Sequence, residues 1–427
     1  MPELLDVEEA RRLVLAQVAR LDAEEVSLPE ALGRVLARDA RSGEPVPGFD
    51  NSAMDGYALR AADVREATAA SPVRLAVIDE SRAGRPADRA VGAGKAIAIS
   101  TGAMLPAGAD AVVRLEDTAA SDGAVEIRAA ATPGANVRHA GEDVRAGETV
   151  LAAGTKLGPA ELGVLASIGV DPVASVRRPR AQIVVSGDEL AAPLEPLGPG
   201  KVRDANGFTL PALVRRSGAV VAGLAYVGDD PAATRDALAA ALGADLIVVS
   251  GGVSVGRHDH IRPALAEVGV QEVFWGIALR PGKPTWFGVH PGGALVIGVP
   301  GNPVSAMVCF LLLARPGILA MLGAAPDRDR TQARLGASYA KRPGRMHAVR
   351  CRLRLDSGGW LAEPTGPQGS HILTSMLAAD ALAIIPSARE SVRRGERVQL
   401  LALPGGEMPS GAAAVSPGSE AAAWTTT

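Results

Sequence analysis

The stretch ADLIVVSGGVSVGRHDH, residues 244–260, joins an apolar run to a glycine-rich turn. The run ADLIVV is short and rich in β-branched residues, which is typical of a buried strand. Gly251 and Gly256 have the spacing of the phosphate-binding loop of nucleotide hydrolases. Arg257 and His258, however, stand where that loop needs Lys and then Ser or Thr. The stretch therefore predicts a strand and a ligand-binding turn without the chemistry of triphosphate hydrolysis.

The same order of strand, turn and helix recurs on both sides of this stretch. AQIVVSGDEL (181–190) and ALVIGVPGNPVSA (294–306) each join an apolar run to small residues. VVAGLAYVG (220–228) is predicted as a further strand, and the dipeptide 230–231, Asp-Pro, opens a helix. Asn206 is expected to cap another helix. Strands that alternate with helices predict a parallel sheet covered on both faces.

The remaining segments differ in pattern from this central part. Residues 4–20 carry apolar side chains at near-helical spacing, which predicts an amphipathic helix. Residues 41–147 contain short β-prone runs between Gly, Pro and Asp, which indicates a small β-rich domain. A helix is predicted over 158–169, with Pro near its start and Gly just past its end. Short β candidates follow residue 326, and residues 405–427 have the composition of a disordered tail.

Composition excludes several classes of protein. A chain of 427 residues is expected to form two to four domains. Its 44 basic and 47 acidic side chains give a net charge of −3, which is no electrostatic footprint for nucleic acid or anionic lipid. The two cysteines cannot form a disulfide framework or a four-thiolate zinc site, and both are predicted to be small buried hydrophobes.

A soluble, cytoplasmic protein is expected, because the sequence shows neither a signal peptide nor a membrane-spanning segment. The acidic N-terminus lacks the basic region and long apolar core of a signal peptide. The longest apolar stretch, VSAMVCFLLLA, is interrupted by Arg315 and Pro316 and is predicted to be too short to span a bilayer.

Three turns of the central part are predicted to converge on a ligand. In open α/β sheets, ligands bind beyond the carboxyl ends of the strands. SGDEL (186–190), SGGVSVGRHD (250–259) and VPGNPVSA (299–306) all follow such strands, and their Gly, Ser and Asn residues leave backbone N–H groups free for a phosphate. For one loop alone, a simple turn is sufficient explanation. Three loops with adjacent carboxylates favour a binding site.

Charged residues sharpen this prediction. Glu189, Asp229 and Asp259 follow predicted strands and are candidate ligands for Mg²⁺, which prefers oxygen donors shared with phosphate. Asp229 also fits a structural role, because Asp-Asp-Pro is a good helix start. The turn RPGKP, residues 280–284, places two cations where an oxyanion can bind. Ser254 and other loop serines are predicted to be hydrogen bonders and not activated nucleophiles.

Seven motifs resemble those of the molybdopterin molybdotransferase family, the MoeA group that also includes the gephyrin E domain. They are PVPGFDNSAMDGYALR (45–60), ISTGAMLPAGADAVV (99–113), GEDV (141–144), SGDEL, SGGVSVGRHD, RPGKPTWFG and VPGNPVSA. The resemblance extends from about residue 4 to about residue 403. The combination of DNSAMDGYA with SGGVSVG and PGNPVSA is highly specific to the family, whereas each alone is weak and the first also fits a tight turn.

The resemblance implies a magnesium-dependent transferase that takes adenylylated molybdopterin and molybdate and releases molybdenum cofactor and AMP. The SGGVSVG loop would then hold the phosphorylated end of the pterin. The protein's task would be positioning and charge neutralisation by cations, backbone N–H groups and Mg²⁺. Two rival functions are a molybdopterin adenylyltransferase, which makes the adenylylated intermediate, and a carrier or scaffold without turnover.

The family's functional residues transfer by position. The implied catalytic residues are Asp55, Thr101, Asp143, Glu189, Asp229, Asp259 and Lys283, of which Glu189, Asp229 and Asp259 are the metal candidates. The implied cofactor-binding residues are Asp204, Asn206, Ser250, Gly251, Gly252, Ser254, Arg280, Pro300, Gly301, Asn302, Ser305, Arg345 and Ser370. Two positions depart from the family: Arg280 replaces the first Lys of K-P-G-K, and Gly276 stands where some members carry Lys.

The resemblance also implies the architecture, an elongated homodimer with the active cleft shared between subunits. A discontinuous helical dimerisation domain would comprise residues 1–45 and 146–178, around a β-rich insert at 46–145. An α/β molybdopterin-binding domain would follow at 179–327, then a C-terminal β domain at 328–404 and the tail. Handover of substrate or product to molybdopterin adenylyltransferase and to molybdoenzyme chaperones would follow from the same family role.

Overall fold

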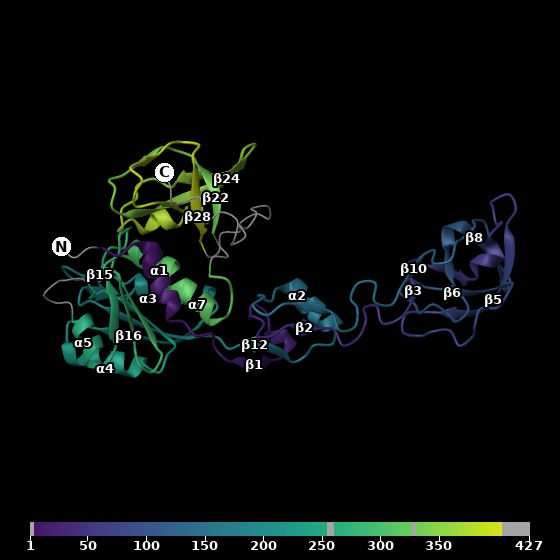
Figure 1. The fold of residues 1–427 in the computed structure, drawn as a ribbon, viewed down its shortest axis with the longest axis horizontal. Helices are drawn as coiled ribbons and strands as arrows, with labels where there is room; N and C mark the ends of the chain where they lie inside the picture. The colour runs from purple at the N-terminus through teal and green to yellow at the C-terminus, as the bar shows by residue number, and fades with distance from the viewer. Residues whose placement is uncertain (1–3, 254–259, 327–329, 404–427) are drawn as a thin grey trace. The chain divides into compact units, whose positions relative to one another are not determined.

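The computed structural model describes residues 4–253, 260–326 and 330–403 (Figure 1). The chain divides into two units that are each described by themselves. The first unit comprises Met1–Glu24, Gly33–Ala37 and Ser175–Thr427, and the second comprises Glu25–Leu32 and Arg38–Ala174. The boundary between the units passes through the short strands β1 (Ala23–Val26) and β12 (Val173–Val176).

The first unit contains a six-stranded sheet in the order β16-β13-β17-β21-β20-β18. Its first four strands are parallel, whereas β20 and β18 are antiparallel. The predicted parallel sheet is therefore confirmed for its first four strands, and the other edge is mixed. The strands are β13 (Arg180–Ser186), β16 (Val220–Val227), β17 (Leu246–Ser250), β18 (Gln271–Trp275), β20 (Trp286–Val289) and β21 (Leu295–Val299). The short strands β14 (Leu190–Ala191) and β15 (Val202–Arg203) follow β13 in the chain and form a separate two-stranded sheet.

Helices cover both faces of this sheet, as the sequence pattern predicts. Alternate strand residues divide between two cores, with Ile183 and Val248 in one and Val184 and Val249 in the other. The first core receives α1 (Val7–Ala16), α3 (Asn206–Arg216), α6 (Pro303–Cys309) and α7 (Arg315–Met321). The second receives α4 (Pro231–Ala241) and α5 (Ile261–Glu267).

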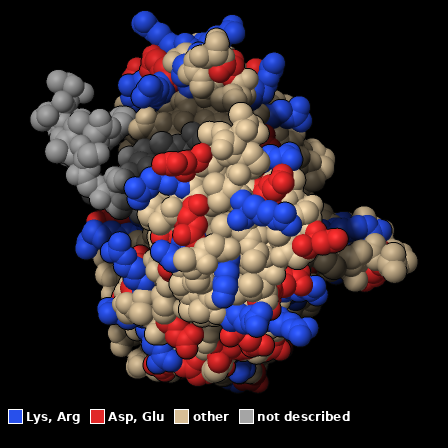
Figure 2. All heavy atoms as spheres, turned by 90° about the vertical axis from the view of Figure 1, so that its right-hand side faces the viewer, with Lys and Arg blue, Asp and Glu red and all other residues tan. Residues whose placement is uncertain are grey.

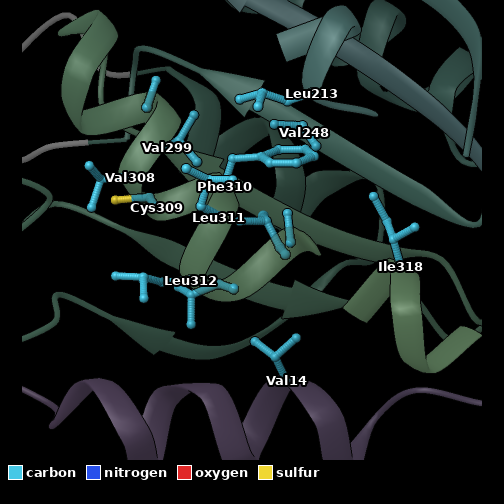
Figure 3. Close-up of a cluster of buried hydrophobic side chains, with 14 of the residues drawn as sticks. Val14, Leu213, Val248, Val299, Val308, Cys309, Phe310, Leu311, Leu312 and Ile318 are labelled. Atoms are coloured by element: carbon cyan, nitrogen blue, oxygen red, sulfur yellow. The ribbon is translucent and has the colours of Figure 1, made fainter. Parts of the chain in front are cut away.

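The N-terminal helix α1 packs in the first unit, and the expectation that residues 1–45 and 146–178 form one discontinuous domain stays a prediction. Asp6 caps α1 by accepting a hydrogen bond from the Glu8 N–H at 2.9 Å. Val7 and Val14 then form a buried stripe, and Figure 3 shows Val14 directed at the side chains around Leu312 and Ile318. The helix α2 (Pro159–Ser167) belongs to the second unit. Burial of this apolar stripe decides the position of α1.

The apolar segment at 303–321 is one continuous 19-residue helical run, which corrects the expected interruption at Arg315 and Pro316. A π-helical segment, η4 (Phe310–Ala314), joins α6 to α7 and provides the wider turn that a following proline requires. By length and mean hydropathy of 2.0 this run qualifies as a membrane span, but 89% of it is buried inside the protein. Phe310 and Leu311 fill the centre of the first core (Figure 3).

The C-terminal part of the first unit is a closed sheet. Each strand in the order β24-β25-β22-β28-β26 pairs with the next, and β26 also pairs with β24, so the sheet closes into a small barrel. The short strand β19 (Leu279–Arg280) pairs with β24. The predicted C-terminal β-structure is therefore present. Its strands are β22 (Arg330–Leu335), β23 (Tyr339–Ala340), β24 (Met346–Asp356), β25 (Gly359–Pro364), β26 (Ala381–Ile385), β27 (Ser391–Val392) and β28 (Arg397–Ala402).

The second unit contains the β-rich segment and the helix α2. Its main sheet has the order β7-β4-β6-β5-β9-β8, and short pairs β2–β11 and β3–β10 accompany it. The strands are β2 (Ala40–Arg41), β3 (Asn51–Ser52), β4 (Gly56–Leu59), β5 (Val73–Ser81), β6 (Lys95–Ile99), β7 (Ala111–Arg114), β8 (Thr118–Ser121), β9 (Ala124–Ile127), β10 (Val137–Arg138) and β11 (Thr149–Leu151). The helix α2 begins at Pro159 and is followed by Gly169 at φ +71°, as predicted.

Candidate active site

The parallel strands bring the predicted loops to one edge of the sheet. Ser186 pairs with Val227, and Ser250 pairs with both Val185 and Val299. The turns that follow β13, β16, β17 and β21 therefore begin side by side. We call this edge the glycine-loop site; it comprises residues 186–190, 204–206, 228–230, 250–253 and 300–305.

Asn206 connects two of these loops. Its side-chain amide donates to Ser250 Oγ at 2.7 Å and to the Gly301 carbonyl oxygen at 2.8 Å. Asn206 is only 5% exposed, and its Oδ1 atom has no hydrogen-bond partner among the described residues. A buried acceptor without a donor is costly, so this atom is a natural contact for a donor group on a bound molecule or water.

Asp204 supports the same corner from the side of the protein. Both of its carboxylate oxygens accept from the Gly207 N–H at 3.0 Å, and Tyr226 Oη donates to Oδ2 at 3.0 Å. Burial, together with this hydrogen bond, raises the pKa of Tyr226 to about 12. Asp204 therefore accepts from a backbone N–H in the first turn of α3, whose N-terminal cap position is Ala205. The expectation that Asn206 is the cap is wrong, because α3 begins at Asn206 itself.

The glycines of the site allow a close approach of backbones. Gly251 has φ +85°, and a Cβ atom there would lie 2.4 Å from the Ser186 carbonyl oxygen. Gly252 has φ +62°, and its Cβ would meet Ile261 Cγ1 at 2.5 Å. The Gly251 N–H donates to the Val299 carbonyl oxygen at 3.1 Å. Only glycine fits this crossing of two loops.

The loop after β21 completes the predicted set. Pro300 and Gly301 lead into Asn302, which stands at the N-terminal cap of α6, and Pro303 occupies the first turn. Ser305 is 4% exposed and lies on the same helix. Most of the predicted cofactor-binding residues therefore lie at this edge of the sheet: Asp204, Asn206, Ser250, Gly251, Gly252, Pro300, Gly301, Asn302 and Ser305. Ser254 lies outside the described residues.

The predicted magnesium ligands do not form a cluster in the described part of the chain. Glu189 and Asp229 are both exposed, and no group of three or more His, Cys, Asp or Glu side chains that suits a metal is found there. Asp259 lies outside the described residues. The neighbouring Asp188, which no sequence motif indicated, accepts from the Asp229 N–H at 3.1 Å. Asp230, and not Asp229, caps α4 through the Ala232 N–H at 2.9 Å.

A tryptophan anchors the glycine loop from outside the site. Trp275 Nε1 donates to the Val253 carbonyl oxygen at 2.9 Å. The Arg262 guanidinium lies 5.3 Å from the centre of the Trp275 ring, and it also pairs with Glu272 at 2.9 Å. Glu272 in turn accepts from Trp286 Nε1 at 2.6 Å. The backbone at Val253 is therefore held by a network of side chains that no sequence motif predicts.

A second group of site residues gathers where β19 meets the barrel. Arg280 pairs in register with His347, and Arg345 lies two residues before His347. Burial, together with the charges of Arg280, Lys341 and Arg345, lowers the pKa of His347 to about 4. We call Arg280, Lys341, Arg345 and His347 the cation cluster. None of its three permanent cations forms an ion pair with a described carboxylate, so it suits an oxyanion.

The remaining predicted residues of the first unit flank this cluster in sequence. Lys283 is half-buried, and its carbonyl accepts from the Ile277 N–H at 3.0 Å in the RPGKP turn. Ser370 is half-buried in the loop before η5 (Leu373–Met376). Gly276 is buried at φ +82°, where a side chain is strained and would meet Leu4 Cδ2 at 3.2 Å. A backbone requirement thus explains the glycine at this position.

In the second unit, the structure joins Asp55 to Thr101. Asp55 Oδ1 accepts from the Thr101 N–H at 2.7 Å and from Thr101 Oγ1 at 3.1 Å, and both residues are exposed. The next residue, Gly56, has no room for a side chain, because a Cβ would lie 2.0 Å from the Val113 carbonyl oxygen. This motif is therefore both a structural turn and a presented carboxylate.

Asp143 lies in a separate part of the second unit's surface. It is exposed and lines an open hollow of about 590 Å³ formed by Gly141–Asp143 and Arg145–Glu148. Its N–H donates to the Val46 carbonyl oxygen at 3.0 Å. No hydrogen bond joins Asp143 to Asp55 or Thr101 within the described ranges, so their common role stays a prediction.

Family models match most of the chain. Residues 5–169 match the MoeA N-terminal region (domain I and II), residues 182–320 match a probable molybdopterin binding domain, and residues 332–403 match the MoeA C-terminal region (domain IV). The three matches contain, in turn, the main sheet of the second unit, most of the central sheet of the first unit and the C-terminal barrel.

Curated relatives and solved structures are similar over nearly the full length. Molybdopterin molybdenumtransferase 2 of Mycobacterium tuberculosis is 37% identical over 403 residues, covering 92% of this chain and 98% of the relative. The molybdopterin molybdenumtransferase of Haemophilus influenzae is 36% identical over 93% of this chain and 98% of its own. The crystal structure of a molybdopterin biosynthesis MoeA protein from Pyrococcus horikoshii OT3 has a TM-score of 0.81 and 31% identity, and covers 94% of this chain and 100% of that chain.

Proposed function

This chain belongs to the MoeA family of molybdopterin molybdenumtransferases, and we propose that it inserts molybdate into adenylylated molybdopterin with release of AMP. It is a transferase of molybdenum cofactor biosynthesis. The adenylylated substrate, the release of AMP and the Mg²⁺ requirement are the finer parts of the proposal. They join the family role to the phosphate-binding and oxyanion-binding features of this chain.

The observation that carries the proposal is the presence, in one unit, of two complementary anion sites. The glycine-loop site would offer backbone N–H groups to a phosphate. The unpartnered Asn206 Oδ1 would accept a hydrogen bond from a donor group elsewhere on the same ligand. The cation cluster offers charges without a described counter-ion, which suits the molybdate dianion. A reaction between molybdate and the dithiolene of a phosphorylated pterin needs both.

The chain's own residues would act chiefly by binding and orientation. The Ser250 hydroxyl would donate to the phosphate end, and Gly251, whose N–H is taken by the Val299 carbonyl oxygen, would only allow its close approach. Arg280, Lys283 and Arg345 would hold the oxyanion near the sulfurs. Such preorganised donors stabilise the charge that develops when molybdenum–sulfur bonds form and the phosphoanhydride breaks. This division of labour gives no role to an activated nucleophile of the protein.

The Mg²⁺ requirement rests on exposed carboxylates at the same edge of the sheet. Glu189 and Asp229 are accessible there, and the third expected ligand, Asp259, lies outside the described residues. The described residues alone assemble no metal site, and no step of the reaction is assigned to the ion. When bound, Mg²⁺ would neutralise the phosphates of the substrate.

A homodimer and a cytoplasmic location complete the proposal. The Asp55–Thr101 pair lies in the second unit and presents an exposed carboxylate that has no cation partner among the described residues, so it is suited to act on a substrate held by a partner copy. Handover to a molybdopterin adenylyltransferase or to molybdoenzyme chaperones follows from the same role. On the face drawn in Figure 2, basic and acidic side chains are interspersed, in keeping with a small-molecule substrate.

The test is AMP release from adenylylated molybdopterin by the purified protein with Mg²⁺, in the presence and absence of molybdate. We expect molybdate-dependent release in the wild type, and at least a tenfold lower rate in Asp55→Asn. Asp122→Asn, an exposed carboxylate in the turn between β8 and β9 of the same unit, serves as the matched control. Nucleoside triphosphate consumption would instead indicate an adenylyltransferase, and bound intermediate without AMP release would indicate a carrier.

A further inference from the structure

The Thr285 hydroxyl lies buried at the end of the RPGKP turn. Thr285 is 0% exposed, and its Oγ1 donates to the Gly282 carbonyl oxygen at 2.7 Å. The same hydroxyl oxygen lies 3.0 Å from Cys309 Sγ. Because the one hydrogen of the hydroxyl goes to Gly282, the thiol is the donor in this second contact. Burial raises the pKa of Cys309 to about 12, so the thiol keeps its proton at neutral pH.

The RPGKP turn packs directly on Cys309. Gly282 is buried at φ +132°, and a Cβ atom there would lie 2.5 Å from Cys309 Sγ and 2.8 Å from Leu279 Cδ2. The sulfur also lies 3.7 Å from the Gly282 carbonyl oxygen. Only glycine fits such a place. The turn therefore approaches helix α6 closely, and a side chain of that helix supports it from within the core.

Lys283 stands between anchored residues of the same turn. Before it, the Thr285 hydroxyl holds the Gly282 carbonyl oxygen. The Lys283 carbonyl oxygen accepts from the Ile277 N–H at 3.0 Å, and the Thr285 carbonyl oxygen accepts from the Gly276 N–H at 2.8 Å. The bond from the Thr285 hydroxyl is made by a side chain, so a substitution can remove it. The backbone that carries the Lys283 ammonium group therefore depends on the residue type at position 285.

Cys309 connects this turn to the glycine-loop site. It lies at the end of α6, the helix that follows Asn302 and carries Ser305. Ser305 and Cys309 are four positions apart, so they lie on the same face of the helix, one turn from each other. Ser305 is 4% exposed and Cys309 is 0% exposed. One helical turn, continued through Thr285, therefore sets the spacing between the predicted phosphate contact and the turn that carries Lys283.

We propose that Thr285 is a positioning residue for the oxyanion that the RPGKP turn binds. Its hydroxyl holds the backbone of the turn, so that Lys283 is preorganised for the anion. Its contact with Cys309 keeps the turn at a fixed spacing from the glycine-loop site. Thr285 acts through Lys283 and not on the anion, because its hydroxyl is buried and its hydrogen is already donated. The inference rests on the proposed function, since it takes molybdate as the anion held by Lys283.

Equilibrium titration of the full-length protein with molybdate alone, by calorimetry, tests this directly. Thr285→Val keeps the branched shape of the side chain but leaves the buried Gly282 carbonyl without its donor. We expect about tenfold weaker molybdate binding. Thr285→Ser keeps the hydroxyl and should bind molybdate as the wild type does. Thr331→Val, which changes a threonine that is 8% exposed on β22 of the barrel, is the matched control and should also bind as the wild type.

Steady-state kinetics of AMP release separate positioning from general damage. In Thr285→Val the KM for molybdate should rise about tenfold, while the KM for adenylylated molybdopterin should stay unchanged. Cys309→Ala removes the thiol that donates to Thr285 and packs against Gly282, so it should raise the KM for molybdate in the same direction. This second variant decides the question if Thr285→Val does not fold.

Four results would overturn the inference. They are wild-type molybdate affinity in the folded Thr285→Val or Cys309→Ala protein, an affinity in Thr285→Ser as low as in Thr285→Val, an equal rise in both KM values, and no molybdate binding by the wild type. If the wild type binds molybdate but releases no AMP, the proposed function fails, while the titration still decides the role of Thr285.

Discussion

Replacement of Trp275 by Phe tests whether the glycine loop is held from outside the site. Phenylalanine keeps an aromatic ring beneath Arg262 but removes the indole N–H that donates to the Val253 carbonyl oxygen at 2.9 Å. Val253 is only 2% exposed, so its carbonyl would be left without a partner in a buried position. An unsatisfied buried acceptor costs about 1–3 kcal/mol. The conformation that Gly251–Val253 adopts in this structure would lose that much of its free-energy advantage over alternatives.

A loop that spends less time in its binding conformation binds more weakly by the same factor. A loss of about 1.4 kcal/mol corresponds to a tenfold weaker affinity, so we expect the KM for adenylylated molybdopterin to rise about tenfold. The KM for molybdate should stay unchanged, since the cation cluster does not contact Trp275. Steady-state AMP release at varied concentrations of each substrate measures both values.

Trp360→Phe is the matched control, because Trp360 lies on β25 of the barrel and should leave both KM values unchanged. Circular dichroism should show the same secondary structure in both variants. A wild-type KM for the pterin substrate in Trp275→Phe would refute the reasoning, since it would mean that the loop keeps its conformation without this hydrogen bond.

Three further predictions follow from the structure. Gly251→Ala should abolish activity and lower the melting temperature, because φ +85° and a backbone oxygen 2.4 Å from the new Cβ leave it no room, whereas Gly243→Ala, with nothing near its Cβ, should do neither. The pKa of about 4 for His347, below its ordinary 6.5, means that the folded state binds fewer protons than the unfolded chain between these pH values. The free energy of unfolding should therefore fall as the pH drops through that window, and it should fall less in His347→Asn. An equal pH dependence in the wild type and the variant would contradict this account. Burial raises the pKa of Cys309 and Cys351 to about 12, so neither thiol should react with iodoacetamide at pH 8 unless the protein is unfolded, and rapid labelling of the native protein would count against it.

The sequence predicts the central sheet well because each strand is followed by its own turn and helix. The apolar runs before Ser186, Ser250 and Pro300 became β13, β17 and β21, in parallel and in register. The antiparallel edge formed by β18 and β20 was not foreseen, because RPGKP separates them and does not resemble a hairpin. The helix α1 itself was predicted, but an amphipathic stripe shows only that a helix is buried and not against which partner it packs.

The sequence also predicted the positions of the glycine-rich and charged motifs of the site. It did not predict the residues that support those motifs. Asn206 and Ser250 were selected from a resemblance, and the structure supplies the reason, a shared hydrogen bond of 2.7 Å that links two loops. Asp188 was overlooked beside Glu189, because a carboxylate that caps backbone N–H groups looks the same in sequence as one that faces a ligand.

Trp275 and Arg350 show the limit most clearly. Each acts on the backbone carbonyls of a loop, Val253 in one case and Pro367 and Gly369 in the other. Every residue has a backbone carbonyl, so a contact to a carbonyl does not require any particular residue type there. A sequence motif therefore cannot indicate such a contact. The two side chains are also far in sequence from the loops they hold, by 22 and by 17 or 19 positions. Loops that recognise phosphate or oxyanion through backbone groups thus depend on supporting residues that only the folded chain identifies, and these are where substitution should change one KM without the other.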